Sequence, residues 1–312
     1  MKKIIIDTDP GQDDALALLL ALASPEDLEV LGIVAVAGNV PLQHTLNNAL
    51  RLVELSGRTD VPVFAGAERP MRQVLVTAEH VHGATGLDGV DLPSPKIKVQ
   101  DKPGIEFIVD TIRAHPAGDI TIVTLGPLTD IALAFRAAPD IIPRVGQIVA
   151  MLGSWKELGN VTPTAEFNAY VDPDATDIVL NSGVDIVMLP LDATHQVIST
   201  QARIGVLKAM DNRSGPQAAI MLKASEAFDI TKFGGDGAPL HDPCTIAWLI
   251  RPELFSGKRV NVAVETRGEL TLGMTVVDWY SATERKPNVL FMNRADGDGF
   301  YTLLFERLRR LP

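Results

Sequence analysis

The chain has 312 residues, of which 46% are hydrophobic and 21% charged, as in an ordinary globular protein. Its formal net charge of −11 predicts an acidic surface that repels phosphate backbones and anionic lipids, which argues against nucleic acid and membranes as partners. The single cysteine, Cys244, excludes an internal disulfide, and the apolar run at residues 4–6 is too short for a signal peptide, so we expect a soluble, cytoplasmic protein.

Short runs of Ile and Val alternate with longer helical patterns along the chain. Unbroken runs of this kind are typical of strands that are buried on both faces of a sheet. In chain order, the expected strands are residues 4–6, 30–37, 61–64, 120–125, 147–152, 185–189, 260–265 and 289–293. The expected helices are residues 15–23, 42–56, 105–114, 128–137, 173–181, 201–233 and 243–250. This alternation predicts an α/β fold with an open, mostly parallel sheet and helices on both faces, in one domain spanning residues 1–312.

Four carboxylates lie within eight residues at the end of the first expected strand, at Asp7, Asp9, Asp13 and Asp14. Ligands of open α/β sheets bind beyond the carboxyl ends of the strands, so the cluster lies where a site is expected. The acids would repel one another, and a hard cation with oxygen ligands, Ca²⁺ or Mg²⁺, removes that cost. The alternative is that Asp9 only caps the next helix while Asp13 and Asp14 complement its dipole, which leaves Asp7 unexplained. The segment therefore predicts a metal site.

Polar groups after later strands are weaker signals when each is taken alone. Asn39 follows the second strand, where a turn asparagine is common. After the strand at 120–125 the side chains are apolar, so Leu125 could contribute only its backbone carbonyl. Glu166 and Asn168 stand two residues apart, so they would face the same way in an extended chain.

The segment before the helix at 243–250 allows two interpretations. Asp242 followed by Pro243 has the pattern of an N-cap with proline in the first helical position, so Asp242 alone would be a cap. His241 precedes it, and His82 lies much earlier in the chain. A lone histidine is more often structural than catalytic, and Cys244 inside the helix has no feature that would lower its pKa.

Residues 7–14, Asp-Thr-Asp-Pro-Gly-Gln-Asp-Asp, match the D-x-D-P-G-x-D-D signature of the inosine–uridine-preferring nucleoside hydrolases. The chain resembles this family over nearly its whole length. Further segments that carry the resemblance are Gly38-Asn39, Val81-His82-Gly83, residues 125–129, Gly159-Asn160, residues 165–168, His241-Asp242-Pro243 and residues 272–276. The resemblance implies an N-glycosyl hydrolase that cleaves ribonucleosides to ribose and a free base, assembled as a homotetramer or dimer.

The resemblance also implies a Ca²⁺ ion as cofactor. Its ligands would be the carboxylates of Asp9, Asp14 and Asp242 and the backbone carbonyl of Leu125. Asp9 would also be the general base that takes a proton from the water held by the metal. A positioned general base contributes about 10²–10⁴-fold to the rate. Asp7 would support the metal ligands from behind.

The remaining roles implied by the resemblance concern the substrate. His241 would face the leaving base as a catalytic group, with His82 nearby, as in the pyrimidine-preferring branch. A histidine can donate a proton to the departing base if its pKa is near neutral. The residues that would bind the ribose hydroxyls are Asp13, Asn39, Asn160, Glu166 and Asn168.

Departures from the family pattern bear on the choice of base. Residues 151–160 replace the usual M-G-G motif with a segment one residue longer. Phe233 stands where some pyrimidine-preferring members carry tyrosine, and we expect it at the base. Gly83 occupies a place where the purine-specific branch stacks the base on tryptophan. The lack of that tryptophan favours uridine and cytidine as substrates, and hence a role in pyrimidine salvage.

Three alternatives stay open on the sequence. The enzyme could have a broad or purine-preferring range. It could be a Mg²⁺-dependent phosphatase similar to haloacid dehalogenases, with Asp7 as nucleophile and Asp9 as acid/base, although that chemistry does not need Asp13 and Asp14. It could also be a non-catalytic receptor for ribose or nucleosides that binds a metal.

Overall fold

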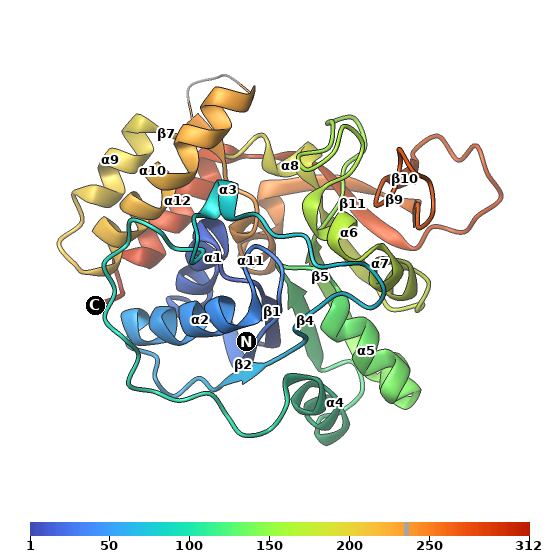
Figure 1. The fold of residues 1–312 in the computed structure, drawn as a ribbon, viewed down its shortest axis with the longest axis horizontal. Helices are drawn as coiled ribbons and strands as arrows, with labels where there is room; N and C mark the ends of the chain where they lie inside the picture. The colour runs from blue at the N-terminus through green and yellow to red at the C-terminus, as the bar shows by residue number, and fades with distance from the viewer. Residues whose placement is uncertain (234–236) are drawn as a thin grey trace.

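The structure of the protein is a computed structural model that describes residues 1–233 and 237–312, with side chains described for 1–224 and 237–312. A nine-stranded sheet with the order β10-β9-β11-β6-β5-β4-β1-β2-β3 crosses the described part of the chain (Figure 1). Its pairs are parallel except for those of β9 with β10 and β11. The strands are β1 (Lys2–Thr8), β2 (Leu28–Ala35), β3 (Val63–Ala65), β4 (Ile120–Thr124), β5 (Val145–Met151), β6 (Ile186–Leu189), β9 (Phe255–Val264), β10 (Thr275–Asp278) and β11 (Val289–Ala295).

Helices cover both faces of this sheet, which confirms the predicted fold class. Ile4 and Ile6 of β1 belong to one hydrophobic core and Ile5 to the other, which is why the strand is apolar without alternation. The first core is closed by α1 (Gln12–Leu22), α2 (Leu42–Ser56), α9 (Gln201–Lys208), α10 (Ser214–Phe233), α11 (Pro243–Ile250) and α12 (Gly297–Leu308). The second is closed by α4 (Gly104–Ala114), α5 (Thr129–Ala137) and α7 (Pro173–Leu180).

Smaller elements connect these helices and strands, several of them near the site. They are α3 (Glu79–His82), α6 (Phe167–Val171), α8 (Leu191–Thr194), the antiparallel pair β7 (Ile198–Thr200) and β8 (Gly237–Pro239), and the 3₁₀ turns η1 (Pro139–Arg144) and η2 (Pro252–Leu254). None of these had been predicted, and neither had β10 and α12.

The helix expected over residues 201–233 is instead two helices, α9 and α10. The chain between them is held by the end of the sequence, because the backbone N–H groups of Arg213 and Ser214 donate to the carbonyl oxygen of Pro312 at 2.9 and 3.1 Å. The side-chain oxygen of Asn212 accepts from the Gly215 N–H at 2.9 Å and so starts the second helix. A contact with a distant residue therefore interrupts a locally continuous helical pattern.

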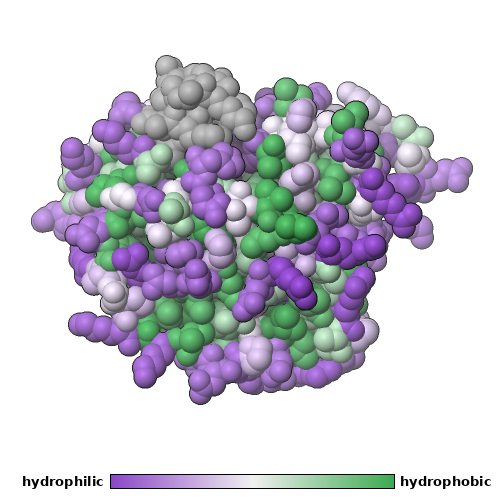
Figure 2. Space-filling view, in the orientation of Figure 1, coloured by the Kyte–Doolittle hydropathy of each residue, from purple (hydrophilic) through white to green (hydrophobic). Residues whose placement is uncertain are grey.

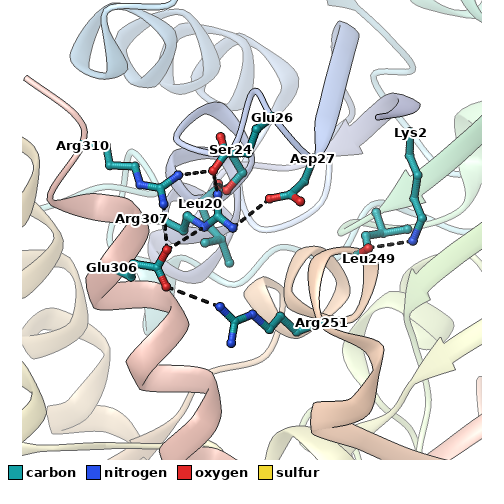
Figure 3. Close-up of polar contacts among 10 residues, drawn as sticks. All are labelled: Lys2, Leu20, Ser24, Glu26, Asp27, Leu249, Arg251, Glu306, Arg307 and Arg310. Carbon is teal, nitrogen blue, oxygen red and sulfur yellow. Dashed lines mark hydrogen bonds and ion pairs between the residues drawn. The ribbon is translucent and has the colours of Figure 1, made fainter.

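The last helix is tied to the start of the chain by a buried arginine (Figure 3). The Arg307 guanidinium, only 7% exposed, forms ion pairs with Glu26 and with Asp27, the latter at 2.8 Å. Arg310, which is more exposed, shares Glu26 and also pairs with Glu306 at 2.7 Å. Through these contacts α12 fixes the turn between α1 and β2, and α1 carries two of the acids of the site.

Hydrophilic residues line the rim of the face drawn in Figure 2, and apolar residues on that face lie in separate patches. Among the described residues, no helix is both long enough and apolar enough to cross a membrane.

Candidate active site

A single cavity brings together residues from many strand ends. The predicted site residues that line it are Asp13, Asn39, His82, Leu125, Asn160, Glu166, Asn168, His241 and Asp242. Asp9 and Asp14 do not line the cavity but are buried beside it, and Asn39 bonds to both of them. Phe233 ends α10, and its side chain lies outside the described residues, so its predicted contact with the base stays untested.

The loop from β1 into α1 is folded around the carboxylate of Asp14. One of its oxygens, Oδ1, accepts from the Thr8 hydroxyl at 2.6 Å and from the Asp9 N–H at 3.2 Å. The other, Oδ2, accepts from the Gly11 N–H at 3.1 Å and from the Asn39 side-chain amide at 3.1 Å. Gly11 rather than Asp9 is the N-cap of α1, so the alternative in which Asp9 caps this helix is wrong.

The Asp9 carboxylate is positioned by the loops that follow β2 and β4. Its Oδ2 accepts from the Asn39 N–H at 2.7 Å, and the Asn39 amide donates to the Asp9 carbonyl at 3.1 Å. Its Oδ1 is buried and has no hydrogen-bond donor among the described residues. A buried carboxylate oxygen without a hydrogen-bond donor is unfavourable unless a cation or a bound molecule interacts with it.

Asp242 brings a further acid to the same place from the start of α11. Although it is the N-cap residue, its side chain makes no capping hydrogen bond, so the cap alternative does not describe it. Carboxylate oxygens of Asp13, Asp14 and Asp242 lie within 4.8 Å of one another. No lysine or arginine is found among the described residues that line the cavity.

The electrostatics of these acids fit a bound cation. Burial, and then the charge of Asp14, raise the pKa of Asp9 well above its usual value. Burial raises the pKa of Asp242 in the same way, followed by the charges of Asp13, Asp14 and Asp9. A divalent cation with oxygen ligands would remove both penalties, and it would satisfy the free oxygen of Asp9. The donor set present therefore suits a hard metal ion.

Asp7 lies behind this cluster and faces a second buried acid, Asp130 of α5. Burial, and then the charge of Asp130, raise the pKa of Asp7 well above its usual value. Burial raises the pKa of Asp130 to about 6, although the Ala67 N–H donates to its carboxylate at 2.8 Å. Neither oxygen of Asp7 has a donor among the described residues. These surroundings favour the protonated form of Asp7.

Glu166, Asn168 and Asn160 reach the cavity from α6 and the loop before it, not from the extended chain that was expected. Glu166 is the N-cap of α6, where its carboxylate accepts from the Asn168 N–H at 2.8 Å and the Gly153 N–H at 2.8 Å. Burial nevertheless raises the pKa of Glu166 to about 7. Asn160 accepts from the Phe167 N–H at 2.9 Å, and the Asn168 amide donates to the carbonyl oxygens of Leu125 at 2.6 Å and Met151 at 3.1 Å.

Two predicted histidines line the cavity, and both are held by neighbouring side chains. The His82 ring contacts the Gln12 side chain, whose amide also donates to the His82 carbonyl at 3.0 Å. The His241 Nδ1 and the Thr194 hydroxyl share a hydrogen bond of 2.7 Å. Burial lowers the pKa of His82, and burial followed by the nearby His195 and His82 lowers the pKa of His241 to about 3. His241 is therefore a neutral imidazole near pH 7.

The sequence analysis missed two titratable groups that line the cavity: His80 of α3, and His195, which follows α8. The His195 ring centroid lies 5.7 Å from that of His241. The signal that could have found it is the one that identified Asp9 and Asn39, because α8 directly follows the carboxyl end of β6.

Comparisons with known proteins agree with this geometry. The family model described as inosine-uridine preferring nucleoside hydrolase matches residues 4–302. The chain is 47% identical over 307 residues to the pyrimidine-specific ribonucleoside hydrolase RihA of Salmonella typhimurium, covering 98% of each protein. Among solved structures it is similar to a purine-preferring ribonucleoside hydrolase from Gardnerella vaginalis, with a TM-score of 0.91, 31% identity and coverage of 99% of this chain and 98% of that one. It is also similar to the plant nucleoside hydrolase PpNRh1, with a TM-score of 0.92, 35% identity and coverage of 98% of each chain.

Proposed function

Because the chain belongs to the inosine-uridine preferring nucleoside hydrolase family and is an N-glycosyl hydrolase of ribonucleosides, we propose that it depends on Ca²⁺ and prefers uridine and cytidine. Membership of the family decides against the phosphatase and the non-catalytic receptor. The single observation that carries the proposal is one cavity that joins an unneutralised acid cluster, a set of buried amide and carboxyl groups, and histidines.

The metal would be held by the carboxylates of Asp9, Asp14 and Asp242 and by the carbonyl oxygen of Leu125. The free Oδ1 of Asp9 and the mutual repulsion of the acids support this assignment. A bound divalent cation would lower the pKa of the attacking water and position it. Calcium suits the site because hard oxygen ligands in a flexible arrangement are the ones it prefers.

The ribose would lie against the polar side chains of the cavity, Asp13, Asn39, Asn160, Glu166 and Asn168. Carboxylates and amides offer both acceptors and donors to a row of hydroxyl groups. Glu166 and Asn168 are already oriented by backbone hydrogen bonds, so little ordering is needed when the sugar binds. Breaking the C1′–N bond develops positive charge on the ribose, which nearby carboxylates stabilise.

Asp9 would act as the general base and take a proton from the water that attacks C1′. With Oδ1 proposed as the metal ligand, Oδ2 accepts one hydrogen bond from the Asn39 N–H and keeps a lone pair for this task. His241 would face the leaving base, with His82 nearby. Because His241 is neutral near pH 7, it would donate a hydrogen bond to the base rather than a full proton.

The preference for pyrimidines is supported by the pyrimidine specificity of the RihA relative at 47% identity and by Gly83 at a place where the purine branch has tryptophan. A purine-preferring structure is also similar, at lower identity. The homo-oligomeric assembly and the cytoplasmic location stay predictions.

The test is ribose release from uridine, cytidine, inosine, adenosine and guanosine, with Ca²⁺ present and with a matched EDTA control. We expect fast, EDTA-sensitive release from uridine and cytidine. Release mainly from inosine or adenosine would contradict the pyrimidine preference but would still support hydrolysis of ribonucleosides. No release from any of the five would contradict the proposed substrate class.

A further inference from the structure

His195 lines the same cavity as His80, His82 and His241. We call the part of the cavity formed by His82, His195 and His241 the base end. The His195 ring lies beside the His241 ring, with centroids 5.7 Å apart and planes inclined by 54°. A nucleobase that meets His241 would therefore meet His195 as well.

His195 is oriented by an acid from the unusual segment at residues 151–160. Its Nδ1 lies 2.9 Å from the Glu157 Oε2, and the two side chains are 24% and 46% exposed. A carboxylate can only accept, so the proton of this bond is carried by Nδ1. Nε2 is then the ring nitrogen whose protonation determines what the imidazole offers to a ligand.

The segment that carries Glu157 is fastened to α8, the helix that directly precedes His195. The Asp192 carboxylate accepts from the backbone N–H groups of Trp155 and Lys156 at 2.7 and 2.8 Å, and the Leu191 N–H donates to the Gly153 carbonyl at 2.9 Å. The Trp155 ring also stacks on Trp279 with centroids 4.4 Å apart. Glu157 is thus presented by a braced loop.

The same short helix also holds the other histidine. Thr194, the last residue of α8, bonds to His241, and His195 follows directly after it. Gly153 of the braced loop donates to Glu166, which stands among the proposed ribose ligands. The braced loop and α8 therefore position both the histidines of the base end and Glu166, a proposed ribose ligand.

We propose that His195, protonated on both ring nitrogens and held through Nδ1 by Glu157, contacts the leaving nucleobase and donates a hydrogen bond to it from Nε2 as the glycosidic bond breaks. This inference rests on the proposed nucleoside hydrolysis. The electron pair of the C1′–N bond departs with the base nitrogen, and the charge spreads to the ring nitrogen and carbonyl oxygen acceptors of the base. A donor aimed at them binds the transition state more tightly than the substrate, so it raises kcat. Glu157 acts as a positioning residue.

The experiment compares natural nucleosides with p-nitrophenyl β-D-ribofuranoside, whose leaving group needs no such donor. We expect His195→Ala to lower kcat on uridine by about 100-fold and to leave hydrolysis of the p-nitrophenyl riboside nearly unchanged. Glu157→Gln keeps an acceptor for Nδ1 and should show a smaller loss that is again confined to the natural substrate. His44→Ala, a histidine on α2 that does not line the cavity, is the control and should match the wild type on both substrates.

Equal losses on the two substrates, or no loss on uridine, would overturn the role of His195 while wild-type hydrolysis leaves the proposed function standing. A wild-type protein that hydrolyses no nucleoside would overturn the proposed function, and the inference with it. Melting curves show whether each variant is folded, because a loss of folding would lower activity on both substrates alike.

Discussion

Gly126 lies directly against the carboxylate of Asp9: a β-carbon on this glycine would be 2.4 Å from the Asp9 Oδ1. On the other side of the carboxylate, a β-carbon on Gly38 would be 2.0 Å from Oδ2. These glycines follow β4 and β2, the two neighbours of β1 in the sheet. The proposed general base therefore lies in a slot between Gly38 and Gly126, where any residue with a β-carbon would collide with its carboxylate.

Gly126→Ala should displace the Asp9 carboxylate and lower kcat for ribose release by about 100-fold, because a misplacement of about 1 Å costs that much. Gly205→Ala is the matched control, since a β-carbon there meets no atom within 4 Å and alanine favours the helix. Steady-state rates on uridine and melting temperatures of both variants test this. Wild-type turnover by a folded Gly126→Ala protein would show that the slot is not needed.

Asp9→Asn removes the proposed base and keeps the shape of the side chain. We expect kcat to fall by about 10²–10⁴-fold, with a much smaller change in substrate binding. The exposed Asp91→Asn is the control for a lost charge. Rates measured with excess Ca²⁺, together with calorimetric binding of uridine to the slow variant, separate the two effects. Hydrolysis at the wild-type rate would mean that another group takes the proton.

Removing the metal should abolish ribose release, and adding Ca²⁺ should restore it. The ion would bind the folded protein and find no formed site in the unfolded chain, so it should also raise the melting temperature. At 100 times the dissociation constant the stabilisation is about 2.7 kcal/mol. Thermal unfolding in EDTA and over a Ca²⁺ titration measures this. Full activity after exhaustive chelation would contradict the metal assignment.

Glu166 should make the metal-free protein less stable as pH rises. Its pKa is about 7 in the folded protein and lower in the unfolded chain, so folding retains a proton that the unfolded chain releases. This contribution is complete below about pH 4.5 and is lost as pH rises through about 7, by at most about 3 kcal/mol. Asp130, with a pKa of about 6, acts in the same direction.

Urea unfolding in EDTA at pH 5 and pH 8 tests this, with Glu166→Gln as the comparison. The variant should show a smaller difference between the two pH values than the wild type does. An identical difference in both proteins would mean that Glu166 ionises with the same pKa in the folded and unfolded states.

Where a signal is local, the sequence was sufficient to predict structure. The helix at Leu42–Ser56 has the bounds that were predicted, because Gly57 ends it with a positive φ of 75°. The helix at Pro243–Ile250 also has its predicted bounds, set by the proline at its start. Asp9 and Asn39 were found because residues that follow parallel strands meet at one edge of the sheet.

Features that depend on distant parts of the chain were not predictable in this way. The interruption between α9 and α10 depends on the Pro312 carbonyl, and the burial of Asp7 against Asp130 depends on how α5 packs. Asp242 has the local pattern of a cap, and only the tertiary structure shows that its side chain turns to the acid cluster instead. The pairing order of the strands is likewise a property of the whole fold.

The acid cluster joins residues that are far apart in the chain, and this has a consequence for folding. Asp14 lies on α1, whereas Asp242 directly precedes α11, after six of the nine strands of the sheet. A folding intermediate in which α11 has not yet packed against α1 holds repelling carboxylates without their last partner. A bound ion would therefore favour the molecules in which these two distant helices have come together.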